Sequence, residues 1–256
     1  KLQGMFSFCI WDSNKKKFLA YRDRFGIKPI YYCKYKSQFI VSSEIKDIIA
    51  INQDKSENQS VVIKYLARGF LDDNTETFYK NVTSLKPGHY LELTNKKFSI
   101  KKYWNLEQTD EKKYDEEEFL NIFSKTINLH LRSDVPIAFA LSGGIDSNAI
   151  TSLSVKNSIN ENYMKAFSII PPFTIDESIW IDTAVEEYGI DHSYVNLSNT
   201  DSVNAFSKAL FYHDEPFHSS SIYYHFLLRQ EIKKEKFKVL MVGEGADEVL
   251  AGYRRM

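Results

Sequence analysis

Short apolar stretches separated by turn residues run through the first hundred residues of the chain. Their composition predicts strands over residues 5–11, 18–21, 30–35, 38–42, 90–93 and 98–103. Between these strands, Ser43 is placed to cap a helix over residues 45–50, and a second helix is expected over residues 61–67. This part of the chain is therefore predicted to be antiparallel and α+β in character.

Beyond residue 118 the pattern changes, because predicted helices now alternate with short predicted strands, of which residues 137–141 are fully apolar. Helices are expected over residues 119–131, 147–156, 177–188, 203–212 and 222–234. The apolar runs predict strands over residues 137–141, 164–170, 193–196 and 238–242. This alternation is typical of an α/β fold with a doubly wound parallel sheet. The polar residues between Glu107 and Glu118 separate the two patterns, which predicts domains over residues 1–106 and 107–256.

Composition narrows the classes of protein that remain. Of the 256 residues 43% are hydrophobic, which is enough for buried cores and excludes a disordered scaffold. The 33 basic and 34 acidic residues give a formal net charge of −1, which argues against a general nucleic-acid-binding surface. No apolar run approaches the roughly 20 residues that a membrane helix needs. Two cysteines are too few for a disulfide framework and are typical of a reducing compartment, so we expect a cytoplasmic location.

The segment Ser142-Gly143-Gly144-Ile145-Asp146-Ser147 joins a predicted buried strand to a helix. Paired glycines allow a tight turn, and the free N–H groups of the helix's first turn favour an anion. We call residues 142–147 the phosphate loop. It has neither the Lys of a Walker-type loop nor the three spaced glycines of a dinucleotide fingerprint. The alternative interpretation is a glycine turn in which Asp146 only caps the helix.

A carboxylate inside a phosphate-binding loop would repel the phosphate unless a cation lies between the two groups. Mg²⁺ held by one or two carboxylates and by phosphate oxygens is such an arrangement. A second predicted strand leads directly into Gly243-Glu244-Gly245-Ala246-Asp247-Glu248, which we call the acidic loop. Because parallel strands end on the same edge of a sheet, Asp146 and Asp247 are predicted to converge on one metal ion. The alternative for the acidic loop is a solvated turn that caps a following helix.

The phosphate loop is similar to the pyrophosphate-binding motif of N-type ATP pyrophosphatases. Together with the acidic loop and Ala251-Gly252-Tyr253-Arg254, it makes the chain resemble the glutamine-hydrolysing asparagine synthetases. Residues 4–8, 22–32 and 42–46 resemble the latter part of that family's glutaminase domain. The resemblance implies a truncated antiparallel glutaminase domain of the N-terminal-nucleophile type, followed by a doubly wound parallel-sheet ATP pyrophosphatase domain.

What the resemblance implies is an ATP-dependent ligase that converts aspartate to asparagine through β-aspartyl-AMP, with ammonia taken from glutamine. The pyrophosphate is assigned to Ser142, Gly143, Gly144, Asp146 and Ser147, and adenosine contacts are implied for Leu141, Ile169, Val242 and Gly243. Asp146 and Asp247 would ligate Mg²⁺. Glu244 would promote adenylate formation or accept a proton from ammonia, with a purely structural role in the loop as its alternative. Neither nucleic acid nor membrane is implied as a partner, and a homodimer is left open.

The chain departs from the family at its ends. Residue 1 is Lys1, where the family's glutaminase has its nucleophilic cysteine, and Met256 follows soon after the acidic loop. We therefore expect a fragment of a longer synthetase, with Cys9 and Cys33 packing as small apolar groups. Two alternatives stay open: another acyl-adenylating amide-forming synthetase of the same fold, and a catalytically inactive nucleotide-binding remnant. His192 and His213 are expected to be surface or satisfied histidines, and residues 214–221 either contact aspartate or only lead into a helix capped by Ser219 or Ser220.

Overall fold

The computed structural model describes residues 2–95, 97–106, 115–157, 164–172, 175–197 and 202–252. The chain divides into two compact units. The first unit is Lys1–Glu111 together with Leu210–His218, and the second is Lys112–Ala209 with Ser219–Met256. The short segment Leu210–His218 was expected to belong to the second unit, but its contacts place it with the first. Within the described ranges, no helix has the length and apolar character needed to cross a membrane.

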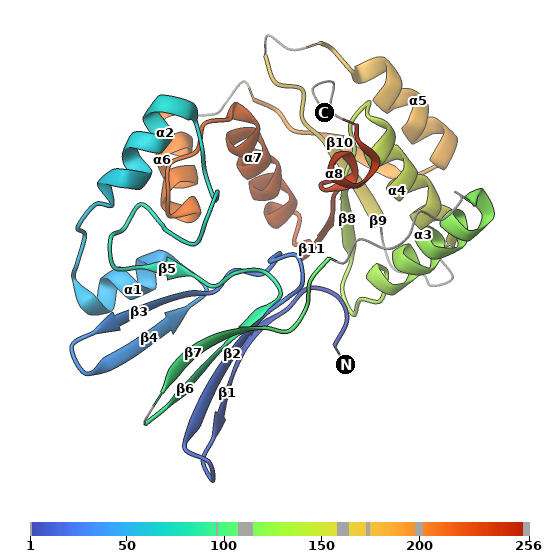
Figure 1. Ribbon diagram of the computed structural model, residues 1–256. Helices are drawn as coiled ribbons and strands as arrows, with labels where there is room; N and C mark the ends of the chain where they lie inside the picture. The colour runs from blue at the N-terminus through green and yellow to red at the C-terminus, as the bar shows by residue number, and fades with distance from the viewer. Residues whose placement is uncertain are drawn as a thin grey trace. The chain divides into compact units, whose positions relative to one another are not determined.

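Two antiparallel sheets form the centre of the first unit (Figure 1). Their strands are β1 (Ser7–Asp12), β2 (Lys17–Arg22), β3 (Tyr31–Tyr35), β4 (Gln38–Ser42), β5 (Thr83–Ser84), β6 (His89–Thr94) and β7 (Phe98–Lys102). The strand orders are β1-β2-β6-β7 and β4-β3-β5, and every pairing is antiparallel, as the sequence predicts. Ala20, Ile30, Leu85 and Leu91 form a shared core in which each is at most 3% exposed. The two sheets therefore pack face to face through alternating apolar side chains.

The helices of the first unit are α1 (Ile45–Asn52) and α2 (Gln59–Arg68), in agreement with the predicted positions. Ile45, Ile48 and Ile49 of α1 pack against Cys33 of β3, which is buried as expected. Cys9 differs from the prediction, because its side chain is exposed. The reason is the position of β1 at the edge of its sheet, where a residue has a strand neighbour on one side only.

The amino end of α1 is capped by a residue far away in the sequence. Ser43 does not cap it: the N-cap position is Glu44, and that side chain makes no capping hydrogen bond. Instead, Asp214 Oδ2 accepts a hydrogen bond from Ile45 N at 2.7 Å, and Oδ1 accepts one from Lys46 Nζ at 2.9 Å. A carboxylate at this position satisfies orphan N–H groups and interacts favourably with the helix dipole. The prediction of the helix was correct, while the prediction of its cap was wrong.

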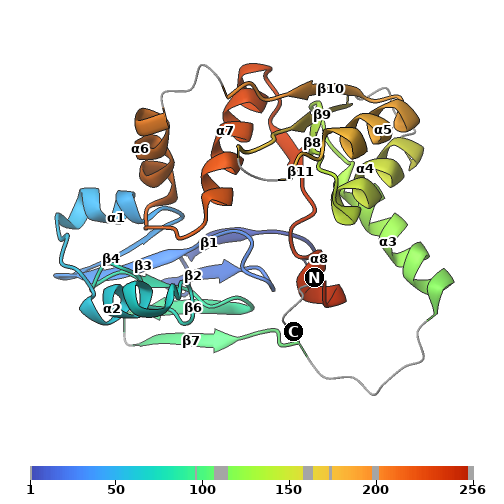
Figure 2. The ribbon, with the colours of Figure 1, turned by 90° about the horizontal axis from the view of Figure 1, so that it is seen from above.

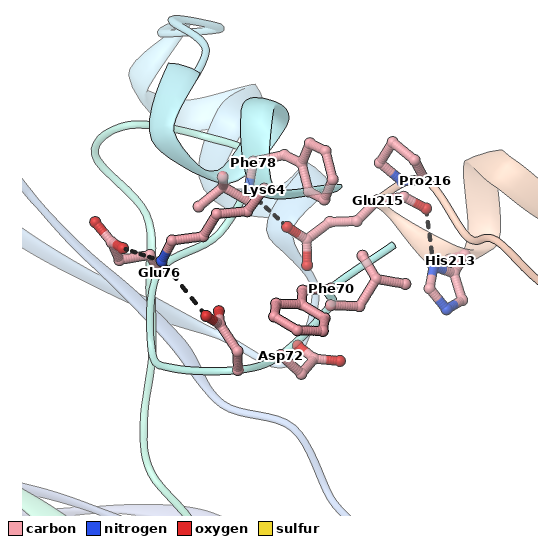
Figure 3. Close-up of a pocket in the computed structure, with 11 residues that line it drawn as sticks. Lys64, Phe70, Asp72, Glu76, Phe78, His213, Glu215 and Pro216 are labelled. Atoms are coloured by element: carbon pink, nitrogen blue, oxygen red, sulfur yellow. Dashed lines mark hydrogen bonds and ion pairs between the residues drawn. The ribbon is translucent and has the colours of Figure 1, made fainter. Parts of the chain in front are cut away.

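The neighbouring residue Glu215 anchors the same segment to the first unit. Its Oε1 atom accepts a hydrogen bond of 2.7 Å from Phe78 N, and Figure 3 shows this carboxylate in a hollow shared with Lys64 and Asp72. Burial raises the pKa of Glu215 from its ordinary value of 4.5 to about 7, and the charge of Asp72 adds to the effect. The Nδ1 atom of His213 lies 2.8 Å from the carbonyl oxygen of Glu215. The segment is therefore held by several polar contacts at once.

The raised pKa of Glu215 predicts a specific dependence of stability on pH. From pH 4.5 to about 7 the unfolded chain loses this proton while the folded chain keeps it, so the free energy of unfolding falls as pH rises through this window. Glu215→Gln removes the titration and retains an oxygen acceptor for Phe78 N. We expect the variant to match the wild type below pH 4.5. Above pH 7 it should exceed the wild type by up to about 2 kcal/mol, a value reduced for the partial exposure of the side chain. Urea unfolding at a series of pH values measures this difference, and parallel pH curves for the two proteins would contradict the expectation.

The second unit is built on a parallel sheet with the order β10-β9-β8-β11. The strands are β8 (Ile137–Ala140), β9 (Met164–Ser168), β10 (Asp191–Tyr194) and β11 (Val239–Met241). The helices are α3 (Glu116–His130), α4 (Ile145–Asn157), α5 (Ser178–Tyr188), α6 (Ser202–His213) and α7 (Ser220–Lys234), and a short α8 (Ala246–Leu250) follows β11. The residues of α6 from Leu210 on belong to the first unit. The predicted parallel sheet with alternating helices is thereby confirmed.

Helices cover both faces of this sheet (Figures 1 and 2), which explains why its central strand β8 consists of apolar residues only. On one face Phe139 is packed with Ile127 of α3 and Ile181 of α5. On the other face Phe167 is packed with Leu228 of α7. Both phenylalanines are fully buried, so each of the two central strands contributes a large side chain to the core.

Candidate functional site

The strand order of the second unit contains a switch point between β8 and β11. From β8 the chain proceeds to β9 and β10 on one side, whereas β11 pairs with the opposite edge of β8. Ligands of open α/β sheets bind beyond the carboxyl ends of the strands at such a point, because the two connections leave in different directions. The phosphate loop follows β8 and the acidic loop follows β11. Both predicted loops therefore begin at the position where this architecture favours a ligand.

The two loops are in contact through Gly243. A Cβ atom placed on Gly243 would lie 3.0 Å from Cβ of Asp146 and 3.1 Å from N of Ser147. These distances are shorter than nearly all ordinary Cβ contacts, so a residue other than glycine would require the neighbouring loop to give by a few tenths of an ångström. The structure thus brings the beginning of the acidic loop against the aspartate of the phosphate loop, as expected from the sheet.

The first three amides of the phosphate loop already have partners within the protein. Ser142 N donates to Ser147 Oγ at 3.1 Å, and Gly144 N donates to Ser142 Oγ at 3.2 Å. Gly143 N donates to Glu177 Oε2 at 2.9 Å. The hydroxyl of Ser147 also lies 3.1 Å from the carbonyl oxygen of Gly144. Hydrogen bonds within the protein therefore fix the conformation of this part of the loop.

The next amides along the chain are the donors that remain for an anion. Asn148 N bonds to the carbonyl oxygen of Gly144 at 3.3 Å and so belongs to the helix. In the described part of the chain, the amides of Ile145, Asp146 and Ser147 have no protein acceptor. These three amides form the first turn of the 13-residue helix α4, where the helix dipole adds partial positive charge. Chemically, this turn can bind a phosphate group.

Asp146 and Asp247 offer oxygen atoms of the kind that Mg²⁺ prefers. Each is half-buried in the first turn of a helix, α4 and α8 respectively. Among the described residues, neither carboxylate forms a hydrogen bond or an ion pair, and a side chain at Gly252 would collide with Oδ1 of Asp247. No described group of three or more metal-binding side chains occurs, so the remaining ligands of an ion here would be water and phosphate oxygens. The residues present fit such an ion, and their convergence on it stays a prediction.

Glu244 is held by two side chains of α7 that the sequence analysis did not identify. Its Oε1 atom lies 3.1 Å from His225 Nδ1 and 3.8 Å from Arg229 Nη2. The hydrogen bond from His225 lowers the pKa of Glu244, and the charge of Arg229 acts in the same direction. His225 and Arg229 are four residues apart and share one face of the predicted helix. That spacing was visible in the sequence, but nothing in it indicated which residue this face would meet.

The residues implied for adenosine lie at neighbouring strand ends. Leu141 follows β8, Ile169 follows β9 and Val242 follows β11. Their contact with a nucleotide stays a prediction.

The carbonyl oxygen of Leu141 accepts a hydrogen bond of 2.6 Å from the hydroxyl of Ser168, whose oxygen lies 2.9 Å from Nε2 of His192.

The hydroxyl proton of Ser168 points to Leu141, so His192 must donate through Nε2. Burial lowers the pKa of His192, which favours the neutral ring. The Nε2 atom of His192 thus has a hydrogen-bond partner within the protein, as expected. Ser219 Oγ caps α7 by accepting a hydrogen bond from Ser221 N, as one of the two expected caps, while contact of residues 214–221 with aspartate stays a prediction.

Two family models match the chain, and together they cover nearly all of it. The model described as "Asparagine synthase" matches residues 118–256, and the model described as "Glutamine amidotransferase domain" matches residues 1–104. The first match contains both the phosphate loop and the acidic loop. The second corresponds to the antiparallel sheets of the first unit.

Curated relatives show the same relationship along the whole chain. A putative glutamine-hydrolysing asparagine synthetase 2 of Methanocaldococcus jannaschii is 31% identical over 99% of this chain and 50% of its own length. Asparagine synthetase 3 of Bacillus subtilis is 30% identical over 98% of this chain and 44% of its own length. The amidase chyE of Penicillium rubens is 30% identical over 98% of this chain and 40% of its own length. The chain thus spans about half the length of the first two relatives, and less of the third.

Among solved structures, the NH3-dependent NAD synthetase of Campylobacter jejuni matches 55% of this chain and 61% of its own, with 17% identity and a TM-score of 0.37.

The asparagine synthase family model matches more than half of the chain and includes the two loops that meet at the switch point. On this basis, the chain belongs to the asparagine synthase family.

Proposed function

We propose that the protein containing this chain is an ATP-dependent ligase that makes asparagine from aspartate, with ammonia supplied by glutamine hydrolysis. The observation that supports this most directly is the contact of Gly243 with Asp146 and Ser147 at the switch point. It brings together an anion-binding helix end and an acidic loop, which is what a reaction on magnesium-bound ATP requires. The family match supports the choice of aspartate and glutamine as substrates.

The proposed reaction proceeds in two steps. A side-chain carboxylate oxygen of aspartate attacks the α-phosphorus of ATP, and the bond to the β,γ-pyrophosphate breaks. The nitrogen of ammonia then attacks the acyl carbon, AMP leaves with the attacking oxygen, and the nitrogen loses a proton to give the amide. The first step makes the carboxyl carbon reactive, because AMP is a far better leaving group than an oxide ion.

Within this reaction the residues of the chain have separate tasks. The amides of Ile145, Asp146 and Ser147 hold the departing pyrophosphate through the first turn of α4. Mg²⁺ held by Asp146 and Asp247 would supply the positive charge that offsets the charge of the phosphates. Glu244, whose pKa is lowered by the hydrogen bond from His225 and which is therefore ionised, would accept the proton from the attacking nitrogen.

The first unit supports glutamine as the source of ammonia through its match to a glutamine amidotransferase domain. We propose that it is part of a glutaminase of the N-terminal-nucleophile type. Neither Cys9 nor Cys33 is assigned as the nucleophile. Cys33 is buried beneath α1, and Cys9 lies within an edge strand, where partial desolvation of its otherwise exposed side chain raises the pKa of the thiol and so disfavours the reactive thiolate.

Oxygen labelling tests the proposed acyl-adenylate. Aspartate labelled with ¹⁸O in its side-chain carboxylate is incubated with the full-length protein, ATP, Mg²⁺ and ammonia. We expect one ¹⁸O atom in the AMP that is released and one in the asparagine, detected by mass spectrometry. Unlabelled aspartate in H₂¹⁸O is the control and should give unlabelled AMP. Label found in orthophosphate alongside ADP, or no reaction with aspartate but reaction with another carboxylic acid, would contradict the proposal.

A further inference from the structure

Glu177 lies directly against the phosphate loop, although it is 34 residues away in the chain. Its Oε2 atom accepts the hydrogen bond from Gly143 N at 2.9 Å. A Cβ atom on Gly143 would lie 3.1 Å from Cβ of Glu177 and 3.3 Å from its Oε2 atom. The side chain of Glu177 therefore lies flat on the glycine, with its carboxylate at the amide and its methylene groups beside the backbone.

The position of Glu177 is set by the helix that follows it. Glu177 is the N-cap residue of α5, and Asp176 Oδ1 accepts a hydrogen bond of 2.9 Å from Ser178 N. One turn later Ile181 is only 1% exposed and packs with Phe139 in the core beneath the sheet. The backbone at Glu177 is thus anchored to the same core as strand β8, from which the phosphate loop emerges.

We infer that Glu177 is a positioning residue of the phosphate loop, an inference that rests on the proposed function. Its carboxylate holds the amide of Gly143 turned toward α5. With the amide of Gly144 held by Ser142, the loop then keeps the conformation in which the first-turn amides of α4 have no acceptor among the described residues. Hydrogen bonds within the protein hold the loop in this conformation, which reduces the entropy that ligand binding would cost.

The charge of Glu177 also restricts where the phosphates bind. A carboxylate bonded to Gly143 N takes this donor out of use and repels a second anion placed beside it. The pyrophosphate is therefore directed to the amides of Ile145, Asp146 and Ser147, next to the two aspartates. Glu177 opposes phosphate binding by its charge and favours it by ordering the loop, and the two effects can be separated by substitution.

Two substitutions of Glu177 make this separation. Glu177→Ala removes both the hydrogen bond and the charge, whereas Glu177→Gln retains an oxygen acceptor for Gly143 N and removes the charge only. Glu187→Ala is the matched control, because Glu187 is an exposed residue of the same helix α5. Two measurements are made on the full-length protein. The first is hydrogen–deuterium exchange of the loop amides without ligand, and the second is the Kd of magnesium-ATP by calorimetry.

We expect exchange at Gly143 to accelerate about tenfold or more in Glu177→Ala, which loses a hydrogen bond to a charged group, and to change little in Glu177→Gln. The Kd of magnesium-ATP should rise by about tenfold in Glu177→Ala and stay equal or fall in Glu177→Gln. Glu187→Ala should resemble the wild type in both measurements.

Other outcomes would overturn the inference. Unchanged exchange at Gly143 in Glu177→Ala would show that the carboxylate does not hold the loop. Tighter magnesium-ATP binding in both variants would show that Glu177 only competes with the phosphates. If the wild type itself does not bind magnesium-ATP, the proposed function fails, and the exchange measurement still decides whether Glu177 holds the loop.

Discussion

Asp146→Asn and Asp247→Asn are each expected to reduce magnesium-dependent release of pyrophosphate from ATP by about 100-fold or more. Both side chains are half-buried at the edge of the sheet where the two loops meet. Neither carboxylate forms a hydrogen bond or an ion pair with another described residue. Asparagine has nearly the same shape as aspartate but lacks the charge that attracts a divalent ion. The loss should therefore arise from metal binding and not from misfolding.

Three controls make this result specific. Hydrolysis of glutamine by the full-length protein should be largely unchanged in both variants, since the amidotransferase match lies in residues 1–104. Glu187→Gln removes an exposed charge from the same unit and should leave pyrophosphate release unaffected. A higher concentration of Mg²⁺ should restore part of the activity of each variant. Normal pyrophosphate release in both aspartate variants would refute the metal assignment.

The second large effect is expected in the first unit, where Asp23 organises a turn. The side chain is 1% exposed, and its two oxygens accept backbone hydrogen bonds from Phe6, Phe25, Ile27 and Lys28 at 2.9–3.3 Å. Replacing Asp23 by Ala would leave these amides without their acceptor inside the protein. We expect a loss of about 3–5 kcal/mol in the free energy of unfolding, measured with urea at pH 7.

Asp23→Asn distinguishes the charge from the shape. Its amide group retains one acceptor oxygen but turns NH₂ toward N–H donors, so we expect an intermediate loss of about 2 kcal/mol. Asp12→Asn is the matched control: Asp12 Oδ1 accepts from Asn14 N at 3.1 Å and from Lys15 N at 3.0 Å, but in an exposed hairpin. Its substitution should cost no more than about 0.5 kcal/mol. Equal losses for Asp12→Asn and Asp23→Asn would show that burial of the Asp23 network is not what stabilises the turn.

The elements of the fold were largely predictable because their signals are local. The strand over residues 38–42 was predicted at its observed bounds, and the helix over residues 203–212 differs from α6 by one residue at each end. Apolar periodicity and turn residues act over a few positions, so a single chain is sufficient to show them. The short strand β5 (Thr83–Ser84) was missed, since two residues are too few for a period.

The meeting of the phosphate loop and the acidic loop was predictable in the same way, whereas the roles of their residues stay predictions. The glycines and acids of the phosphate and acidic loops follow two predicted strands, and the common edge of a parallel sheet indicated that they would meet. The sequence did not reveal that β11 pairs with β8, an order that the chain's alternation alone leaves open. That pairing is what places Gly243 against Asp146.

What the sequence by itself determined is therefore the set of elements, their alternation and the residue types of the two loops. Only the tertiary structure decided which distant partners these groups have: Asp214 at the start of α1, Glu177 at Gly143, and His225 at Glu244. The physical reason is that a carboxylate can accept a hydrogen bond from any suitable donor within reach. Which donor lies within reach depends on the order of the strands and the packing of the helices, and not on residues nearby in the sequence.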